Sequence, residues 1–363
     1  MGVFEVIFDI SYLVLVLSFG LVLLVQNNKN AIIFAWMEII LGIGDSFHLL
    51  PRIISYLSPQ GFGGHLWALS WGKMVTSVTM TFFYLLYYFY YRRVSGDYDK
   101  RKMYILISLA LMRIGLSLMP QNGWGSGEES YAFAIYRNIP FALMGLMLIV
   151  WSYKNKSLPE LKAMWILISL SFIFYLPVVL FADRYPLVGA LMILKTLAYL
   201  FIVIRGLRTY MPKFTRKNLL DISFSSLVMG LGLGAFYREF TKFYNFTGPG
   251  HLSKVHPHIL ILGFVFSLFL YLISKGYGLA SIKKLGGNIK IYLTGLYLSL
   301  ISMLAIGLWE VVGSLNSNYL RAFQAIGGLG HIIIAFAMVR IVLLLIKNDQ
   351  EREAHNELSY KEA

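Results

Sequence analysis

The chain has 363 residues, of which 58% are hydrophobic and 14% charged, and its mean hydropathy is +0.66. A soluble domain of this length cannot bury that much apolar surface, so the composition predicts an all-α, polytopic integral membrane protein. Cysteine is absent, which excludes disulfides, cysteine-bound iron–sulfur clusters and thiolate metal sites. The net charge of +14 is more typical of basic cytoplasmic loops than of nucleic-acid binding.

Apolar runs of about 20 residues predict about eleven transmembrane helices. In chain order they cover residues 3–25, 31–53, 66–91, 102–119, 132–152, 160–181, 185–207, 218–240, 257–275, 288–314 and 320–346. The first run contains Glu5 and Asp9 and lacks a basic region before it. It is therefore expected to stay in the protein as a spanning helix and not to be removed as a signal peptide.

The loops between these helices alternate in charge. Basic residues gather near 29, at 92–102, 154–162, 205–217 and 275–290, and at 347, whereas 59–64, 122–129, 183–184, 247–253 and 316–318 contain few. Because basic loops stay in the cytoplasm, the N-terminus is predicted outside and the C-terminus inside, as an odd number of spans requires. The expected location is the cell membrane, crossed many times, with the lipid bilayer as partner.

The basic, proline-containing loop at 205–218 is the predicted boundary between two blocks. It separates a seven-helix block at 1–212 from a four-helix block at 213–347, and a polar, cytoplasmic tail follows at 348–363. No internal repeat is visible, which gives no support to an inverted-repeat transporter.

In the four-helix block, each helix carries a strong ligand type toward its outer side: Glu239, His256 or His258, Glu310 and His331. Imidazole and carboxylate groups suit zinc, iron or copper, and helix bundles build metal sites from such residues. The sequence therefore predicts an outward-facing site for a divalent transition metal or a haem in this block.

The stretch His256-Pro257-His258 is expected at the start of its helix, because proline fits the first helical turn. The residue before proline is pushed toward an extended conformation, and in a regular helix residues two apart point in different directions. His258 is therefore the preferred ligand of the two. A simpler interpretation pairs Glu239 with Arg238 or Lys242 and leaves Glu310 in an interfacial belt, but His331 lies too deep for an interfacial role.

Four stretches carry a resemblance to a known family: "YREFTKF", "VHPHILILGF", "GLWEVV" and "GLGHIIIAF". Residues 218–346 resemble an uncharacterised bacterial four-helix membrane family with a His-x-His-x-Leu-x-Leu-Gly stretch and a late helical histidine. The resemblance implies a bacterial plasma membrane and no particular function. The same histidine pattern also resembles helices of haem–copper oxidase relatives, in which such histidines bind haem or copper.

The seven-helix block has a second polar group in its spans. Asp45, His48 and Arg52 share one helix face directed toward Lys73, and Arg113 and Lys195 lie in other helices. One interpretation is a salt-bridge cluster that locks the helices together. The other is a proton-relay or binding site, which makes the chain a transporter of a small solute or ion.

Two further resemblances concern this block. The stretch Ser46-Phe47-His48 resembles the serine-to-histidine helix of seven-helix membrane hydrolases, such as alkaline ceramidases and adiponectin receptors. A His-x-x-x-His pair completes the zinc site of those proteins, and residues 185–207 contain no histidine. Lys195, central in a seventh helix, matches the opsin layout and could carry a Schiff base, or it could pair with Asp45 or Asp9.

Overall fold

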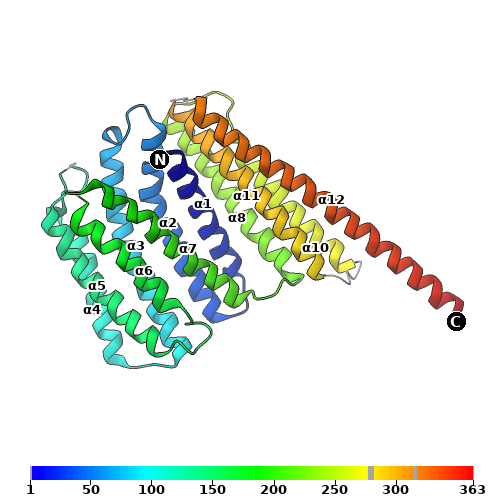
Figure 1. Cartoon of the computed structure of the whole chain (residues 1–363), viewed down its shortest axis with the longest axis horizontal. Coiled ribbons are helices and arrows are strands. Elements are labelled where there is room, and N and C mark those ends of the chain that lie inside the picture. The colour runs from blue at the N-terminus through cyan, green and yellow to red at the C-terminus, as the bar shows by residue number, and fades with distance from the viewer. Residues whose placement is uncertain (1, 127, 183, 277–281, 314–316, 363) are drawn as a thin grey trace. The chain divides into compact units, whose positions relative to one another are not determined.

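The computed structural model describes residues 2–126, 128–182, 184–276, 282–313 and 317–362, and within these ranges all regular structure is helical (Figure 1). The chain forms two compact units. Residues 12–212 make one, called here the N-terminal unit, and residues 1–11 with 213–363 make the other, the C-terminal unit. Parts of four predicted loops, at 127, 183, 277–281 and 314–316, lie outside the described residues.

The N-terminal unit takes in most of α1 and all helices up to α7. Their bounds are α1 Gly2–Leu24, α2 Lys29–Leu57, η1 Gly63–His65, α3 Leu66–Ser95, α4 Lys100–Leu118, η2 Pro120–Asn122, α5 Tyr131–Lys154, α6 Met164–Phe181, η3 Pro186–Ala190 and α7 Leu191–Tyr210. Hydrogen-bonding side chains begin several helices: Asn28 caps α2, Asp99 caps α4 and Ser130 caps α5.

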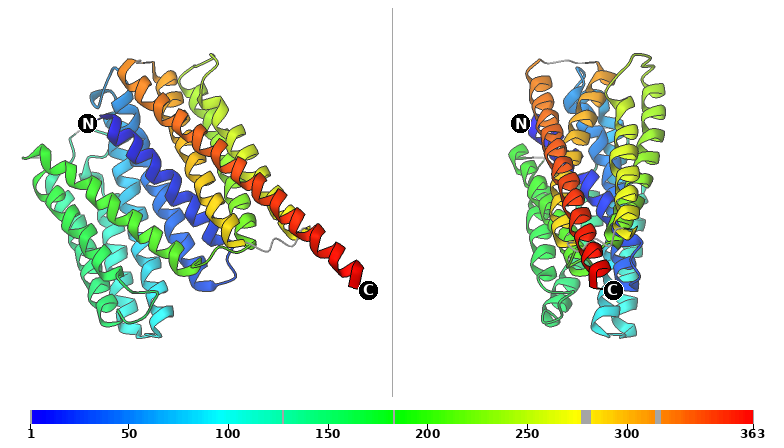
Figure 2. Two further views of the ribbon diagram at one scale, coloured as in Figure 1. Left: turned by 45° about the vertical axis from the view of Figure 1, so that its right-hand side comes forward. Right: turned by 90° about the vertical axis from the view of Figure 1, so that its right-hand side faces the viewer.

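The C-terminal unit contains the remaining helices. They are α8 Lys217–Phe243, α9 Leu252–His258, η4 Ile259–Val265, α10 Phe266–Gly276, α11 Ile282–Val312 and α12 Ser317–Glu362. Helix α12 packs along α11, whereas α8 packs against α9, η4 and α10. The last part of α12 projects beyond α11 (Figures 1 and 2). The segment predicted as a separate polar tail thus continues α12 as a helix.

Among the described residues, nine helical segments are long and apolar enough to cross a membrane, so the chain is a multi-helix membrane protein. Helices α3 and α4 were predicted as spans but are not among the nine. Helix α3 is rich in tyrosine and ends with Arg92 and Arg93, and α4 begins with three basic residues. The count of about eleven spans and the orientation stay predictions.

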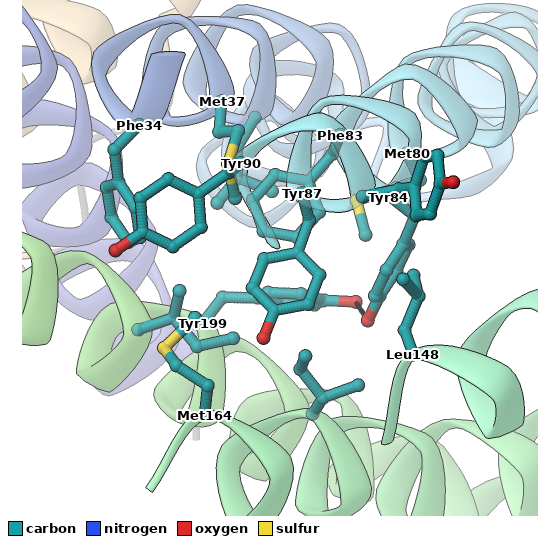
Figure 3. Close-up of a cluster of buried hydrophobic side chains, with 14 of the residues drawn as sticks. Phe34, Met37, Met80, Phe83, Tyr84, Tyr87, Tyr90, Leu148, Met164 and Tyr199 are labelled. Atoms are coloured by element: carbon teal, nitrogen blue, oxygen red, sulfur yellow. Dashed lines mark hydrogen bonds between the residues drawn. The ribbon is translucent and has the colours of Figure 1, made fainter. Parts of the chain in front are cut away.

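The tyrosines of α3 lower its hydropathy, yet they are part of the core of the N-terminal unit. Phe83, Tyr84, Tyr87 and Tyr90 are at most 1% exposed and point toward helices α5 to α7 (Figure 3). Their hydroxyls are paired: Tyr84 with Tyr199 at 3.1 Å, Tyr87 with Ser152 at 2.7 Å and Tyr90 with Tyr210 at 2.9 Å. Helix α3 is therefore the central helix of this unit, and these three hydroxyls are satisfied inside the bundle.

Two glycines let α2 and α3 approach closely at the height of the predicted polar cluster. A Cβ atom on Gly72 would collide with the carbonyl oxygen of Phe47, and one on Gly44 with the side chain of Thr79. Thr76 also donates a hydrogen bond of 3.1 Å to the carbonyl of Gly44. This close packing fixes the side chains that follow Gly44 on α2 against the first turns of α3.

In the C-terminal unit, α12 packs on α11 through small residues. A Cβ atom on Gly330 would lie 2.8 Å from the carbonyl oxygen of Gly295, and one on Gly327 would lie 2.6 Å from the hydroxyl of Ser302. Ser302 donates a 2.6 Å hydrogen bond to the carbonyl of Phe323. The glycines of the "GGLG" stretch that face α11 are thus a packing surface.

The helix expected to begin at Pro257 begins at Leu252, and His251 is its N-cap residue. His256 is helical, so the predicted break at Pro257 and the extended conformation of His256 are wrong. The backbone N–H of His251 donates to the carboxylate of Glu310 at 2.6 Å, which stabilises an earlier helix start. Pro257 has no N–H for the helical ladder, and residues Ile259–Val265 continue in a π-helix.

Candidate functional site

A cavity of about 740 Å³ lies within the N-terminal unit, where α2, α4 and α6 end and α3, α5 and α7 begin. Its lining includes five of the six residues of the predicted polar cluster: His48, Arg52, Lys73, Arg113 and Lys195. These residues come from four helices that are far apart in the sequence. The structure therefore joins the polar stripe of α2 to isolated cations of α3, α4 and α7.

The sixth residue of that cluster, Asp45, is not part of the lining. Its carboxylate accepts a 2.7 Å hydrogen bond from the hydroxyl of Tyr12 and interacts electrostatically with Lys195. The ammonium group of Lys195 lies over the rings of Tyr175 at 4.5 Å and Tyr199 at 5.6 Å. Lys195 thus interacts with Asp45, one of the two acids predicted as its partners. A Schiff base on Lys195 stays a prediction.

Arg113 is the most deeply buried charge of the cavity, with 2% of its surface exposed. Its guanidinium lies 3.2 Å from the ring centroid of Phe141. The Nε and Nη1 atoms are inaccessible and have no hydrogen-bond partner. Two inaccessible donors without acceptors are costly in a protein interior, and an anionic ligand that reached them would supply acceptors.

Arg137 offers a contrast from the neighbouring helix α5. It is 8% exposed and lines the same cavity, but its Nη1 donates to the side-chain oxygen of Asn122 at 2.6 Å. Its guanidinium also lies 4.5 Å from the ring of Trp124. Arg137 is held by protein groups, which makes the unpaired donors of Arg113 the more informative feature.

The remaining polar residues of the lining are partly paired. Lys73 forms an ion pair of 3.1 Å with Glu129, and the guanidinium of Arg52 lies 5.9 Å from the ring of Tyr56. The Nδ1 atom of His48 is buried and has no hydrogen-bond partner. Glu128 and Glu129 were not singled out from the sequence, because they lie in a loop whose position over the cavity has no sequence signal.

In the C-terminal unit, the predicted carboxylate ligands have other partners. Glu239 pairs with Arg238 at 2.7 Å in an exposed ion pair. Glu310 accepts two bonds of 2.6 Å from His251, one from the ring Nδ1 and one from the backbone N–H. His251 was not predicted as the partner of Glu310, because the two residues are 59 positions apart.

The two histidines that flank Pro257 point to different neighbours. The ring of His256 stacks on Tyr237 of α8, with centroids 6.0 Å apart. The ring of His258 lies next to His331 of α12, with centroids 6.4 Å apart and an interplanar angle of 86°. The structure thus brings together His258 and His331 from the predicted ligand set.

Nowhere among the described residues do three or more histidine, aspartate or glutamate side chains gather closely enough to hold a metal ion. A metal or haem in this unit stays a prediction, and of its predicted ligands the structure brings His258 and His331 together.

Comparison with known proteins gives one match. Residues 216–348 match the model of a family described as "Protein of unknown function (DUF2871)". No curated protein and no solved structure matches the chain. The match agrees with the resemblance of the C-terminal block to an uncharacterised family. The histidine motif given for that family stays a prediction. The resemblances of the N-terminal block to membrane hydrolases and opsins stay predictions as well.

Proposed function

We propose that this chain is a multi-pass protein of the cell membrane that binds a small organic anion in the cavity of the N-terminal unit and carries it across the bilayer. The observation that carries the proposal is Arg113, whose inaccessible Nε and Nη1 donors lack acceptors at the edge of a cavity. Carboxylates and phosphates match the planar donor fork of arginine and bind it through paired, charge-assisted hydrogen bonds.

The charge of the lining supports an anionic ligand. Five side chains of the lining are cationic and two are carboxylates, which leaves an excess of three positive charges; the cations are Arg52, Lys73, Arg113, Arg137 and Lys195, and the carboxylates are Glu128 and Glu129. A cleft of one charge sign surrounded by a low-dielectric wall raises the local concentration of the opposite charge.

The other lining residues favour a ligand with an apolar part. Aromatic side chains contribute Tyr56, Phe62, Tyr131, Phe141 and Tyr175 to the lining. The volume of about 740 Å³ lies within the range of ordinary small-molecule pockets. An aryl or alkyl carboxylate or phosphate therefore fits the cavity better than a bare inorganic ion.

The loop charges support an outward position for this cavity. The ends of α3, α5 and α7 away from the cavity adjoin the basic segments 92–102, 154–162 and 205–217, whereas the end at the cavity adjoins 59–64 and 122–129. Under the positive-inside rule the cavity end faces the outside of the cell. A solute would then enter the cavity from outside the cell as a free anion.

A salt-bridge cluster accounts for only part of these charges. It explains Lys73, which pairs with Glu129, and Lys195, which interacts with Asp45. It leaves the two donors of Arg113 without an acceptor. Buried charges in membrane helices usually mark a substrate or ion pathway. An anion-binding site accounts for all of the cations of the cavity together.

The test is ligand binding by the purified full chain, with benzoate and phenyl phosphate as probes and neutral benzamide as the uncharged analogue. Binding is measured by calorimetry, and uptake of radiolabelled benzoate by proteoliposomes. Replacing Arg113 by Met removes charged hydrogen bonds worth about 1.5–3 kcal/mol, so affinity should fall roughly 10- to 100-fold.

The matched control is Arg101→Met, which changes an exposed arginine on the same helix outside the cavity. We expect it to bind both anions as the wild type does. Equal affinity of wild type and Arg113→Met for both anions, or binding of benzamide as tight as that of benzoate, would contradict the proposal. Binding without uptake would reduce the role to that of a receptor.

A further inference from the structure

The pair formed by His258 and His331 lies in the C-terminal unit and takes no part in the anion cavity. His258 ends α9 and is half-buried, and His331 is exposed well inside α12. Because the helix of His258 starts at Leu252, this histidine lies about 10 Å along its helix axis. The two rings are therefore closer in depth than a helix starting at Pro257 would allow.

Both rings are fixed in the same way by the backbone. The Nδ1 atom of His258 lies 2.8 Å from the carbonyl oxygen of Lys254, and that of His331 lies 2.8 Å from the carbonyl oxygen of Gly327. A carbonyl oxygen can only accept, so each Nδ1 carries the proton and donates it. In each neutral ring the Nε2 atom is left with a free lone pair.

This arrangement is the one that metal-binding histidines use. A ligating histidine donates its second ring N–H to a carbonyl or carboxylate, which fixes the tautomer and the ring orientation. Two neutral rings with this tautomer cannot hydrogen-bond to each other through Nε2, because neither Nε2 carries a proton. A Lewis acid between them satisfies both lone pairs at once.

We propose that His258 and His331 are the two axial ligands of a haem iron. Metal–imidazole bonds are about 2 Å long, so two rings on opposite sides of one iron have centroids roughly 6 Å apart. The observed separation is 6.4 Å. Zinc in a structural site takes four protein ligands, whereas a haem supplies four of its own and requires only these two.

The surroundings suit a flat apolar macrocycle. A Cβ atom on Gly328, one turn before His331, would meet no atom within 4 Å. Apolar residues close to the two histidines in the sequence are also exposed: Ile261 by 61%, Ile332 by 68% and Phe336 by 53%. The open space at Gly328 and these side chains give a porphyrin ring room and an apolar surface within the membrane.

The test is the absorption spectrum and haem content of the full chain, purified from a host that makes ample haem. We expect about one haem per chain, in keeping with a single ligand pair. The spectrum should be that of a six-coordinate, low-spin iron with two imidazole ligands. The variants His258→Ala and His331→Ala should each lower the haem content roughly tenfold or more.

His256→Ala is the matched control, because His256 lies on the same helix but stacks on Tyr237; it should keep the full haem content. His331→Met separates ligation from folding, since a thioether can replace one imidazole and should retain iron with a shifted spectrum and a raised potential.

A wild type that is colourless and also takes up no added haemin would overturn the proposal. So would haem loss in His256→Ala equal to that in His258→Ala, or an unchanged spectrum in His331→Met. Uptake of copper(I) by a protein that binds no haem would assign the histidine pair to the metal ion alone and would likewise refute the haem.

Discussion

Replacing Arg113 by Met should make the protein more stable while it removes the anion site. The Nε and Nη1 donors of Arg113 are inaccessible and have no acceptor, and each unpaired donor costs about 1–3 kcal/mol. The stacking of the guanidinium on Phe141 at 3.2 Å returns about 1–2 kcal/mol. The free energy of unfolding should therefore rise by up to about 5 kcal/mol in Arg113→Met.

Intrinsic fluorescence is the suitable assay, because the chain has seven tryptophans and no cysteine for a thiol dye. For a unit of this size, 1 kcal/mol corresponds to a midpoint shift of about 2–4 °C. A benzoate concentration that saturates the wild type should raise its midpoint and shift that of Arg113→Met by less, since the variant is expected to bind the ligand more weakly. A variant that melts below the wild type without ligand would refute the reasoning, because Arg113 would then have acceptors in the native protein.

Two further predictions concern other parts of the chain. Burial alone would raise the pKa of Asp97, but bonds from Lys102 and the backbone N–H of Asp99 hold that pKa below its ordinary value of about 4; the stabilisation is therefore present above pH 4 and lost as the pH falls through the lowered pKa. Asp97→Asn should lower the melting midpoint at pH 7 and match the wild type in strong acid, and a difference that does not change with pH would contradict this. A Cβ atom on Gly330 would lie 2.8 Å from two backbone atoms of α11, so Gly330→Val should cost about 1–3 kcal/mol or more in thermal unfolding. Gly328→Ala, at an open position, is its control, and equal midpoints of these two variants would show that α12 does not pack on α11 in this way.

The helical class and the approximate helix positions could be predicted from the sequence, because apolar runs of spanning length have few alternatives. Helix α3 shows the limit of that approach. Its tyrosines lower the hydropathy of the segment, yet they are buried and hydrogen-bonded to residues as distant as Tyr199 and Tyr210. Hydropathy describes a residue alone, whereas these hydroxyls are made compatible with burial by partners on other helices.

The candidate sites were predictable to different degrees. The stripe of Asp45, His48 and Arg52 follows from helical spacing, so its direction toward α3 could be read from the sequence. The contribution of Arg113 to the same cavity depends on how α4 packs, which spacing within one helix does not specify. In the C-terminal unit, Glu310 was predicted as a metal ligand together with the histidines. Its pairing with His251 could not be predicted, because it joins two residues that are distant in the sequence.

The π-helix at Ile259–Val265 has a consequence for the evolution of this segment. A π turn holds one residue more than an α turn, so it is the trace that a single inserted codon leaves in a helix. An α-helix that kept all of these residues would turn the segment before it by roughly 100° relative to α10. His258 would then turn away from His331. Removing one residue from the π turn would instead restore the ordinary ladder and keep the phase. The rotational phase between these two histidines is thus set by the one extra residue of the π turn.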